Sequence, residues 1–300
     1  MMTHVLQAAG IVKNYATLRA LDGIGIQAAK GEITGLIGPD GAGKSSFMKI
    51  VLGLLKRDSG DLRLFGSDPL IDRSAVRKGV GYMPEVFSLY TDLSVDENLR
   101  FSFQIHRGRM SEYPGLRERL YRFNRLEDFA EARAGTLSGG MKQKLALSCA
   151  LMHSPELLIL DEPTTGVDPL SREEFWTMLK ELKNSGITIL VSTPYMEEAL
   201  QCDHIYLMNR GRVLEQGNPD RLTEDFPGRI IEIDAVPEDP RVVRQRLQQQ
   251  FPGTPVYLAG RRVHLSFSGE EEQIGQGRRV KPDLEDLFLT RIMEEEGADP

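Results

Sequence analysis

The apolar residues in the first three quarters of the chain gather in short runs separated by helical patterns. Four runs predict β-strands, and they span residues 33–38, 157–161, 187–192 and 204–209. The last three are apolar without alternation, which is typical of strands covered on both faces in a parallel sheet. The helical patterns between them indicate βαβ units, so we expect an α/β core.

Two further patterns lie within the same region. Three runs predict a separate antiparallel sheet, at residues 5–9, 25–29 and 61–65. The charged stretch 96–134 has a helical pattern and predicts an insertion within the α/β core. We therefore expect one domain over residues 1–225, with a helical subdomain at about 88–155.

A smaller C-terminal extension is expected at residues 226–300. Turn-forming residues precede it at Gly217-Asn218-Pro219 and Phe226-Pro227-Gly228, and the composition changes after them. The pattern beyond them predicts a small α+β fold. Its expected segments are a strand at 229–235, a helix at 240–250, strands at 255–259 and 262–267, a polar loop and a helix from about Pro282.

Composition narrows the class of protein. The net charge of −7 argues against nucleic acid as a partner, because proteins usually bind it with a basic face. No segment approaches the ~18 apolar residues that a membrane span needs, and no secretory signal is visible at the N-terminus. Any membrane role is therefore expected to come through a partner. The cysteines, Cys149 and Cys202, predict small buried thiols in a reducing cytoplasm.

The strongest chemical motif follows the first strand of the core and opens an apolar helix. It fits the pattern G-x-x-x-x-G-K-[ST] in the strand–turn–helix context of a phosphate-binding loop. Glycines there allow successive N–H groups to turn inward around an anion, and the helix N-terminus adds its dipole. Lys44 is expected to reach the β- and γ-phosphates, and Ser45 to ligate Mg²⁺. The predicted nucleotide-binding residues of this loop are Gly38, Pro39, Asp40, Gly41, Ala42, Gly43, Lys44, Ser45 and Ser46.

A second motif ends the buried strand at residues 157–161. Asp161 emerges at the carboxyl end of that strand, where ligands bind in open α/β sheets, and is expected to serve the Mg²⁺ site. Glu162 is the expected catalytic base or water-orienting residue. A third motif, Leu137-Ser138-Gly139-Gly140-Met141-Lys142-Gln143, predicts a helix that Ser138 caps. Its glycines leave the first N–H groups of the helix bare for an anion.

The order of these motifs, with Thr165-Gly166-Val167-Asp168 after them, resembles the ATPase subunit of an ABC transporter over residues 3–217. That resemblance implies a dimer in which the signature residues Ser138, Gly139, Gly140 and Gln143 act on ATP held by the other chain. It places Asp168 in a loop that crosses the dimer interface. It also places Tyr15 where an aromatic ring stacks on adenine, with core packing as the alternative.

Finer features resemble the export-type ATPases that pair with type-2 ABC permeases. They are Gly81-Tyr82-Met83-Pro84-Glu85, the run 92–98, Tyr195-Met196-Glu197-Glu198-Ala199 and the ending 283–289. Two positions depart from the family. Glu85 stands where glutamine is usual, so it keeps an oxygen for Mg²⁺ but adds charge. Pro194 replaces the switch histidine and has no donor, so slow turnover at the chain's own site is expected.

The expected function is the ATP-binding and ATP-hydrolysing subunit of an ABC exporter, with ATP and Mg²⁺ as ligands. Its expected partners are a type-2 permease and a second ATPase subunit, on the cytoplasmic face of the cell membrane. One alternative is a soluble ABC ATPase of DNA repair or ribosomes, but the long insertions or second ATPase unit typical of those proteins are not seen. Another is a nucleotide-gated regulatory module with little turnover, which Pro194 makes plausible.

Overall fold

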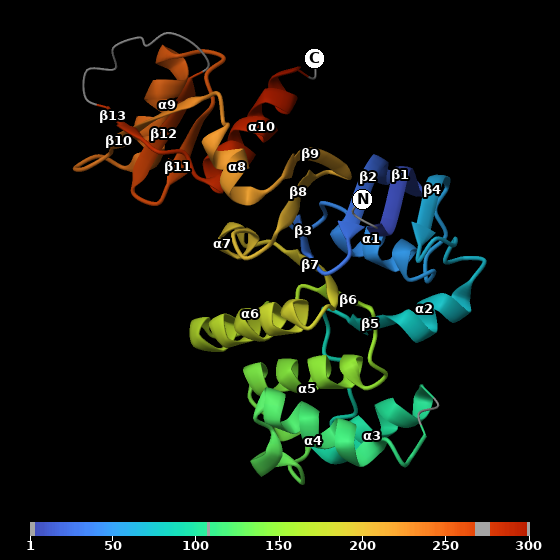
Figure 1. Ribbon diagram of the computed structural model, residues 1–300. Helices are drawn as coiled ribbons and strands as arrows, with labels where there is room; N and C mark the ends of the chain where they lie inside the picture. Colours follow the sequence, from blue (N-terminus) through green and yellow to red (C-terminus); the bar gives the residue numbers. More distant parts are fainter. Residues whose placement is uncertain (1–3, 107–108, 268–276, 299–300) are drawn as a thin grey trace. The chain divides into compact units, whose positions relative to one another are not determined.

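The computed structural model describes residues 4–106, 109–267 and 277–298 (Figure 1). The chain forms two compact units, Met1–Val213 and Leu214–Pro300. The predicted boundary at residue 225 lies about a dozen residues later than this division. The side chain of Asn218 caps a helix that belongs to the second unit. Within the described residues, no helix is both long and apolar enough to cross a bilayer.

A six-stranded sheet is the centre of the first unit, and its last strand, Arg212–Gly217, runs across the division at Val213. Its order is β5-β6-β7-β3-β8-β9. The strands are β3 (Ile33–Ile37), β5 (Val80–Met83), β6 (Leu157–Asp161), β7 (Thr188–Thr193), β8 (His204–Asn209) and β9 (Arg212–Gly217). The neighbouring strands from β5 through β6, β7 and β3 to β8 are all parallel. Every residue of β3, β6 and β7 is buried. The predicted parallel α/β core is confirmed.

A separate antiparallel sheet of order β2-β1-β4 is also confirmed. It consists of β1 (His4–Tyr15), β2 (Leu18–Ala29) and β4 (Ser59–Leu64). One apolar core joins this sheet to the parallel sheet through the helix α1 (Lys44–Val51), whose Phe47, Met48 and Ile50 are buried. Because α1 begins at the phosphate loop, this packing fixes the loop against both sheets.

Helices lie between β5 and β6 in the sequence, where a helical insertion was predicted. They are α3 (Val95–Ile105), α4 (Tyr113–Asn124) and α5 (Gly139–Leu151), and α2 (Arg73–Gly79) precedes β5. Ser94 and Glu97 form a capping box that begins α3. Both α3 and α4 pack on α5, which in turn contacts β5 and the helix α6 (Pro169–Asn184) (Figure 1).

The second unit has an antiparallel sheet of order β11-β12-β10-β13. Its strands are β10 (Arg229–Asp234), β11 (Val256–Ala259), β12 (Arg262–Phe267) and β13 (Arg278–Val280). Its helices are α8 (Pro219–Glu224), α9 (Pro240–Gln250) and α10 (Leu284–Ala298). The predicted α+β pattern is thus confirmed with one correction, because β13 lies where only a polar loop was expected. Part of that loop, residues 268–276, lies outside the described residues.

Candidate nucleotide-binding site

The carboxyl ends of β3, β6 and β7 meet at one edge of the parallel sheet. Ile37 lies opposite Thr193, and Asp161 lies opposite Ser192. The phosphate loop, the Asp-Glu pair and the segment at Pro194 follow these three strands directly. Open α/β sheets bind ligands at this edge, so the fold brings together motifs that are far apart in the sequence.

Gly43 is one position where the loop requires glycine. Its φ is +101°, which side chains of L-residues rarely adopt. A Cβ atom there would also lie 2.7 Å from both the carbonyl oxygen of Ala20 and Cδ2 of Leu21. The backbone of the loop is therefore pressed against β2 as it enters α1.

Lys44 is buried beneath the loop, with 3% of its side chain exposed. Its Nζ donates to the carbonyl oxygens of Gly38, at 2.6 Å, and Pro39, at 3.0 Å. It also lies 3.0 Å from Oε1 of Glu162, which forms a buried ion pair. The predicted phosphate-binding lysine and the predicted catalytic glutamate are therefore neighbours.

Asp161 is held by two hydroxyl groups. Ser45 Oγ and Ser192 Oγ donate to its Oδ1, at 3.0 Å and 2.7 Å. Ser192 Oγ in turn accepts the backbone N–H of Glu162 at 2.9 Å. Glu162 has a φ of +48°, a strained conformation for a residue with a side chain. Strain of this kind is typical of functional positions, and the carboxylate of this residue is the one that pairs with Lys44.

Lys44, Ser45 and Glu162 border a cavity of about 640 Å³, whereas Asp161 does not line it. From the predicted site it contains the loop residues Asp40 to Ser46 together with Tyr15, Glu85 and Glu162. Arg19 and Arg210 also line it, although the sequence did not indicate them, because no local spacing links them to the loop. Tyr15 is 42% exposed and lies outside the core, and Nζ of Lys13 is 5.5 Å from its ring centroid.

The arrangement fits a Mg²⁺ ion that arrives with a nucleotide. Ser45 and Asp161 already share a hydrogen bond, and Glu85 is exposed at the same cavity. Burial, together with the charges of Asp161 and Glu85, raises the pKa of Tyr82 to about 12. Among the residues described, no group of three or more His, Cys, Asp or Glu could hold a metal. Mg²⁺ commonly binds through one or two carboxylates, substrate phosphates and water, so this donor set suits it.

The signature residues lie elsewhere. Ser138 caps α5 and accepts the N–H of Met141 at 3.3 Å, as predicted. Ser138 and Gly139 are exposed, whereas Gly140 is buried against Ser171 of α6. None of the predicted signature residues, Ser138, Gly139, Gly140 and Gln143, lines the cavity at Lys44. Exposed N–H groups at the start of a helix remain available to an anion from outside the chain.

The loop residue Asp168 also has a local role. It caps α6 by accepting the N–H of Ser171 at 2.9 Å, and this hydrogen bond lowers the pKa of its carboxyl group. Pro194 follows β7 and is half-buried. Beyond it, the Arg172 guanidinium carbon lies 4.2 Å from the centroid of the Tyr195 ring. Both cysteines are buried, which raises the pKa of their thiols as expected for apolar packing groups.

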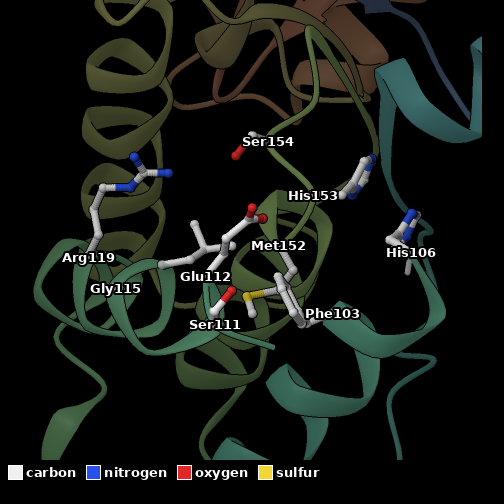
Figure 2. A pocket seen from close by; sticks show the side chains of 10 residues that line it. Phe103, His106, Ser111, Glu112, Gly115, Arg119, Met152, His153 and Ser154 are labelled. Atoms are coloured by element: carbon white, nitrogen blue, oxygen red, sulfur yellow. The ribbon is translucent and has the colours of Figure 1, made fainter. Parts of the chain in front are cut away.

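Another cavity, of about 560 Å³, lies among α3, α4 and the end of α5 (Figure 2). None of its lining residues lines the nucleotide cavity. The imidazole rings of His106 and His153 are stacked there, with centroids 3.8 Å apart. Burial lowers the pKa of both rings, that of His153 to about 4. The phosphate-loop residues line the cavity at Lys44 and not this one.

A phosphate loop, an Asp-Glu pair at a strand end and a capped Ser-Gly-Gly helix define a nucleotide-binding protein of the phosphate-loop class. The family model described as ABC transporter matches residues 21–165. The Nod factor export ATP-binding protein I of Rhizobium sp. strain N33 is 39% identical over 312 residues, which cover 95% of each chain. This chain belongs to the ABC transporter family.

Other relatives are longer. The probable multidrug ABC transporter ATP-binding protein YbhF of Escherichia coli K12 is 42% identical over 240 residues. That alignment covers 80% of this chain but 42% of YbhF, so the chain spans less than half the length of this relative. Among solved structures, an ATP-binding subunit of an ABC transporter matches with a TM-score of 0.67 and 30% sequence identity. The match covers 74% of this chain and 93% of that subunit. A dimeric bacterial ABC transporter cassette has a TM-score of 0.65 and 25% identity, covering 71% and 98%.

Proposed function

We propose that this chain binds and hydrolyses MgATP and thereby drives an exporter whose permease is a separate protein. One observation carries the proposal. Lys44, Ser45, Asp161 and Glu162 are hydrogen-bonded or ion-paired at the ligand-binding edge of the sheet. The similarity to an export ATP-binding protein, which covers 95% of both chains, supports the same function.

The proposed roles follow from the contacts. Lys44 exchanges the carboxylate of Glu162 for the β- and γ-phosphate oxygens, which frees Glu162 to orient the attacking water. Ser45, Asp161 and Glu85 serve Mg²⁺, which neutralises the phosphate charge when bound. Tyr15 stacks on adenine at the open end of the cavity. Gly38 and Pro39, whose carbonyl oxygens hold Lys44, belong to the same loop.

The proposed assembly contains a second ATPase chain, either a copy or a relative. The start of α5 faces the ATP of that second chain through the exposed Ser138 and Gly139. Asp168 lies at the interface between the two chains. A type-2 permease is proposed to dock between the helical insertion and residues 85–93, on the cytoplasmic face of the membrane. The exposed apolar side chains of Val86, Tyr90 and Phe101 support this placement.

Turnover is proposed to be slow because Pro194 cannot donate a hydrogen bond to the transferred phosphate. One missing donor of this kind costs about 3–4 kcal/mol, or roughly 10²–10³ in kcat. ATP binding does not need that donor and is retained. In a dimer with a related ATPase, this chain would hold ATP longer while its signature completes the faster site of its partner.

Steady-state ATP hydrolysis by the purified chain tests the proposal, with Pro194→His and Glu162→Gln as variants. We expect slow turnover that Pro194→His raises and Glu162→Gln abolishes. Glu197→Gln is the matched control, because Glu197 is exposed and carries the same change of charge. Fast turnover that Pro194→His does not change would contradict the proposed role of residue 194.

The second candidate is a nucleotide-gated regulatory module with little turnover, and Pro194 is the observation that favours it. ATP hydrolysis at the same rate in the wild type and in Glu162→Gln, with ATP binding intact, would support this second function instead.

A further inference from the structure

A buried carboxylate beside the nucleotide site has no role in the functions proposed so far. It belongs to Glu198 of the short helix α7 (Met196–Ala199) and is 3% exposed. Its Oε1 accepts the Thr164 hydroxyl at 2.7 Å, and its Oε2 accepts the Thr193 hydroxyl at 2.5 Å. Nε of Arg172 lies 3.5 Å from Oε1. The charge is thus compensated by one cation and two hydroxyl donors.

The two hydroxyl donors, Thr164 and Thr193, lie in the segments next to Glu162 and Pro194. Thr164 stands two residues after Glu162, and its carbonyl oxygen accepts the N–H of Val167 at 3.2 Å in the loop before Asp168. Thr193 is the last residue of β7, and its carbonyl oxygen accepts the N–H of Gly38 at 3.3 Å. One carboxylate therefore connects the segment after Glu162 with the strand that contacts the phosphate loop.

The cation, Arg172, comes from the signature side of the chain. Arg172 lies in the first turns of α6, and the neighbouring Ser171 packs against Gly140 of the signature. The guanidinium of Arg172 also covers the ring of Tyr195. The backbone N–H of Tyr195 donates to the Thr193 hydroxyl at 3.1 Å. The segment around Pro194 is therefore held from both sides, by Thr193 and by Tyr195.

We propose that Glu198 is a positioning residue for ATP hydrolysis. It holds the segments that follow β6 and β7 in the register that points Glu162 at the phosphate loop. Since Pro194 makes no hydrogen bond to a phosphate through a side chain, this buried network replaces the missing contact as the restraint on its loop. The proposal rests on the proposed ATPase function and assigns no contact between Glu198 and the nucleotide.

Four variants test the proposal in the full-length chain. Thr193→Val and Thr164→Val each remove one hydroxyl donor with little change of shape, and both are expected to fold. Glu198→Gln keeps an acceptor oxygen without the charge, and Glu198→Ala removes both. Thr177→Val is the matched control, because its exposed hydroxyl bonds only to Glu173 of its own helix. For each variant, kcat, KM, the melting temperature and the affinity for a fluorescent ATP analogue with Mg²⁺ are measured.

We expect kcat to fall by about 10²-fold in Glu198→Ala, because a displacement near 1 Å of a catalytic group costs about that factor. Glu198→Gln and the two threonine variants should lie between that variant and the wild type. The affinity for the ATP analogue should stay within about twofold in all of them, because Glu198 does not touch the nucleotide. Thr177→Val should match the wild type.

Two results would overturn this proposal and leave the proposed ATPase function standing. One is a wild-type kcat in both threonine variants and in Glu198→Gln. The other is a loss of nucleotide affinity in step with kcat and melting temperature, which indicates a merely structural role. If the wild type hydrolyses ATP no faster than Glu162→Gln, the proposed ATPase function fails and this proposal fails with it.

Discussion

The contact between Gly140 and Ser171 gives a sharp prediction, because it joins the signature to the helix that follows the interface loop. A Cβ atom added at Gly140 would lie 2.6 Å from Oγ and 2.8 Å from Cβ of Ser171. Carbon atoms pack best at about 3.5–4.0 Å, so the overlap is close to 1 Å. We therefore expect Gly140→Ala to push α5 away from α6.

The expected magnitude follows from overpacking, which typically costs about 1–3 kcal/mol. For a unit of this size, that loss lowers the melting temperature by about 2–12 °C. Gly139→Ala is the matched control, since its added Cβ would meet only the carbonyl oxygen of Gly166 at an ordinary 3.8 Å. Alanine is a better helix former than glycine, so this control should be neutral or more stable by up to about 1 kcal/mol.

Thermal unfolding of the two variants, and of Gly140→Ala combined with Ser171→Gly, measures the contact directly. Ser171→Gly removes both crowded atoms, so the double variant should recover most of the loss after the cost of Ser171→Gly itself is subtracted. Equal melting temperatures for Gly139→Ala and Gly140→Ala would refute the reasoning. A double variant without recovery would refute it as well.

Three further predictions concern other parts of the chain. Lys44→Ala should lose ATP binding and about 3–5 kcal/mol of unfolding free energy, because Glu162 is left buried and unpaired; adding Glu162→Gln should restore the stability but not the binding. Tyr15→Ala should weaken ATP binding by about 1–3 kcal/mol if its exposed ring stacks on adenine, whereas Tyr15→Phe should keep the affinity. In the second unit, burial lowers the pKa of His264, but the hydrogen bond and charge of Asp286 outweigh it and leave that pKa above its ordinary value. The resulting stability is present below the ordinary histidine pKa of about 6.5 and is lost as the pH rises through the folded-state pKa, so wild-type melting should fall with rising pH more steeply than that of His264→Gln.

The sequence predicted the core strands well where burial leaves a simple pattern. β6 and β8 match their predicted ranges because both are nearly continuous apolar runs. β5 has four residues and β13 three, and neither is long enough to establish a period. The early part of β2 was missed because its buried residues, Leu21 and Ile24, are three positions apart and do not form the alternation that indicates a strand.

In the site, too, residues within a contiguous motif could be predicted, whereas contacts between distant segments could not. Lys44, Asp161 and Glu162 could be predicted as candidates because each belongs to a contiguous motif with its own chemical pattern. Glu198 was part of a recognised segment, but its buried partners lie far away along the chain. Only the folded sheet places Thr164 beside Thr193, so the network around Glu198 could not be inferred from spacing.

The connection between β5 and β6 has a consequence for how this protein can change over evolutionary time. These strands are direct neighbours in the sheet, yet the chain runs through α3, α4 and α5 between them. It leaves at Met83 and returns at Leu157, points that the strand register separates by only about 10 Å along the strand direction. Insertions and deletions in α3, α4 and their connections can therefore be absorbed without shifting the strands that hold Asp161 and Glu162, as long as α5 keeps its packing on β5 and α6.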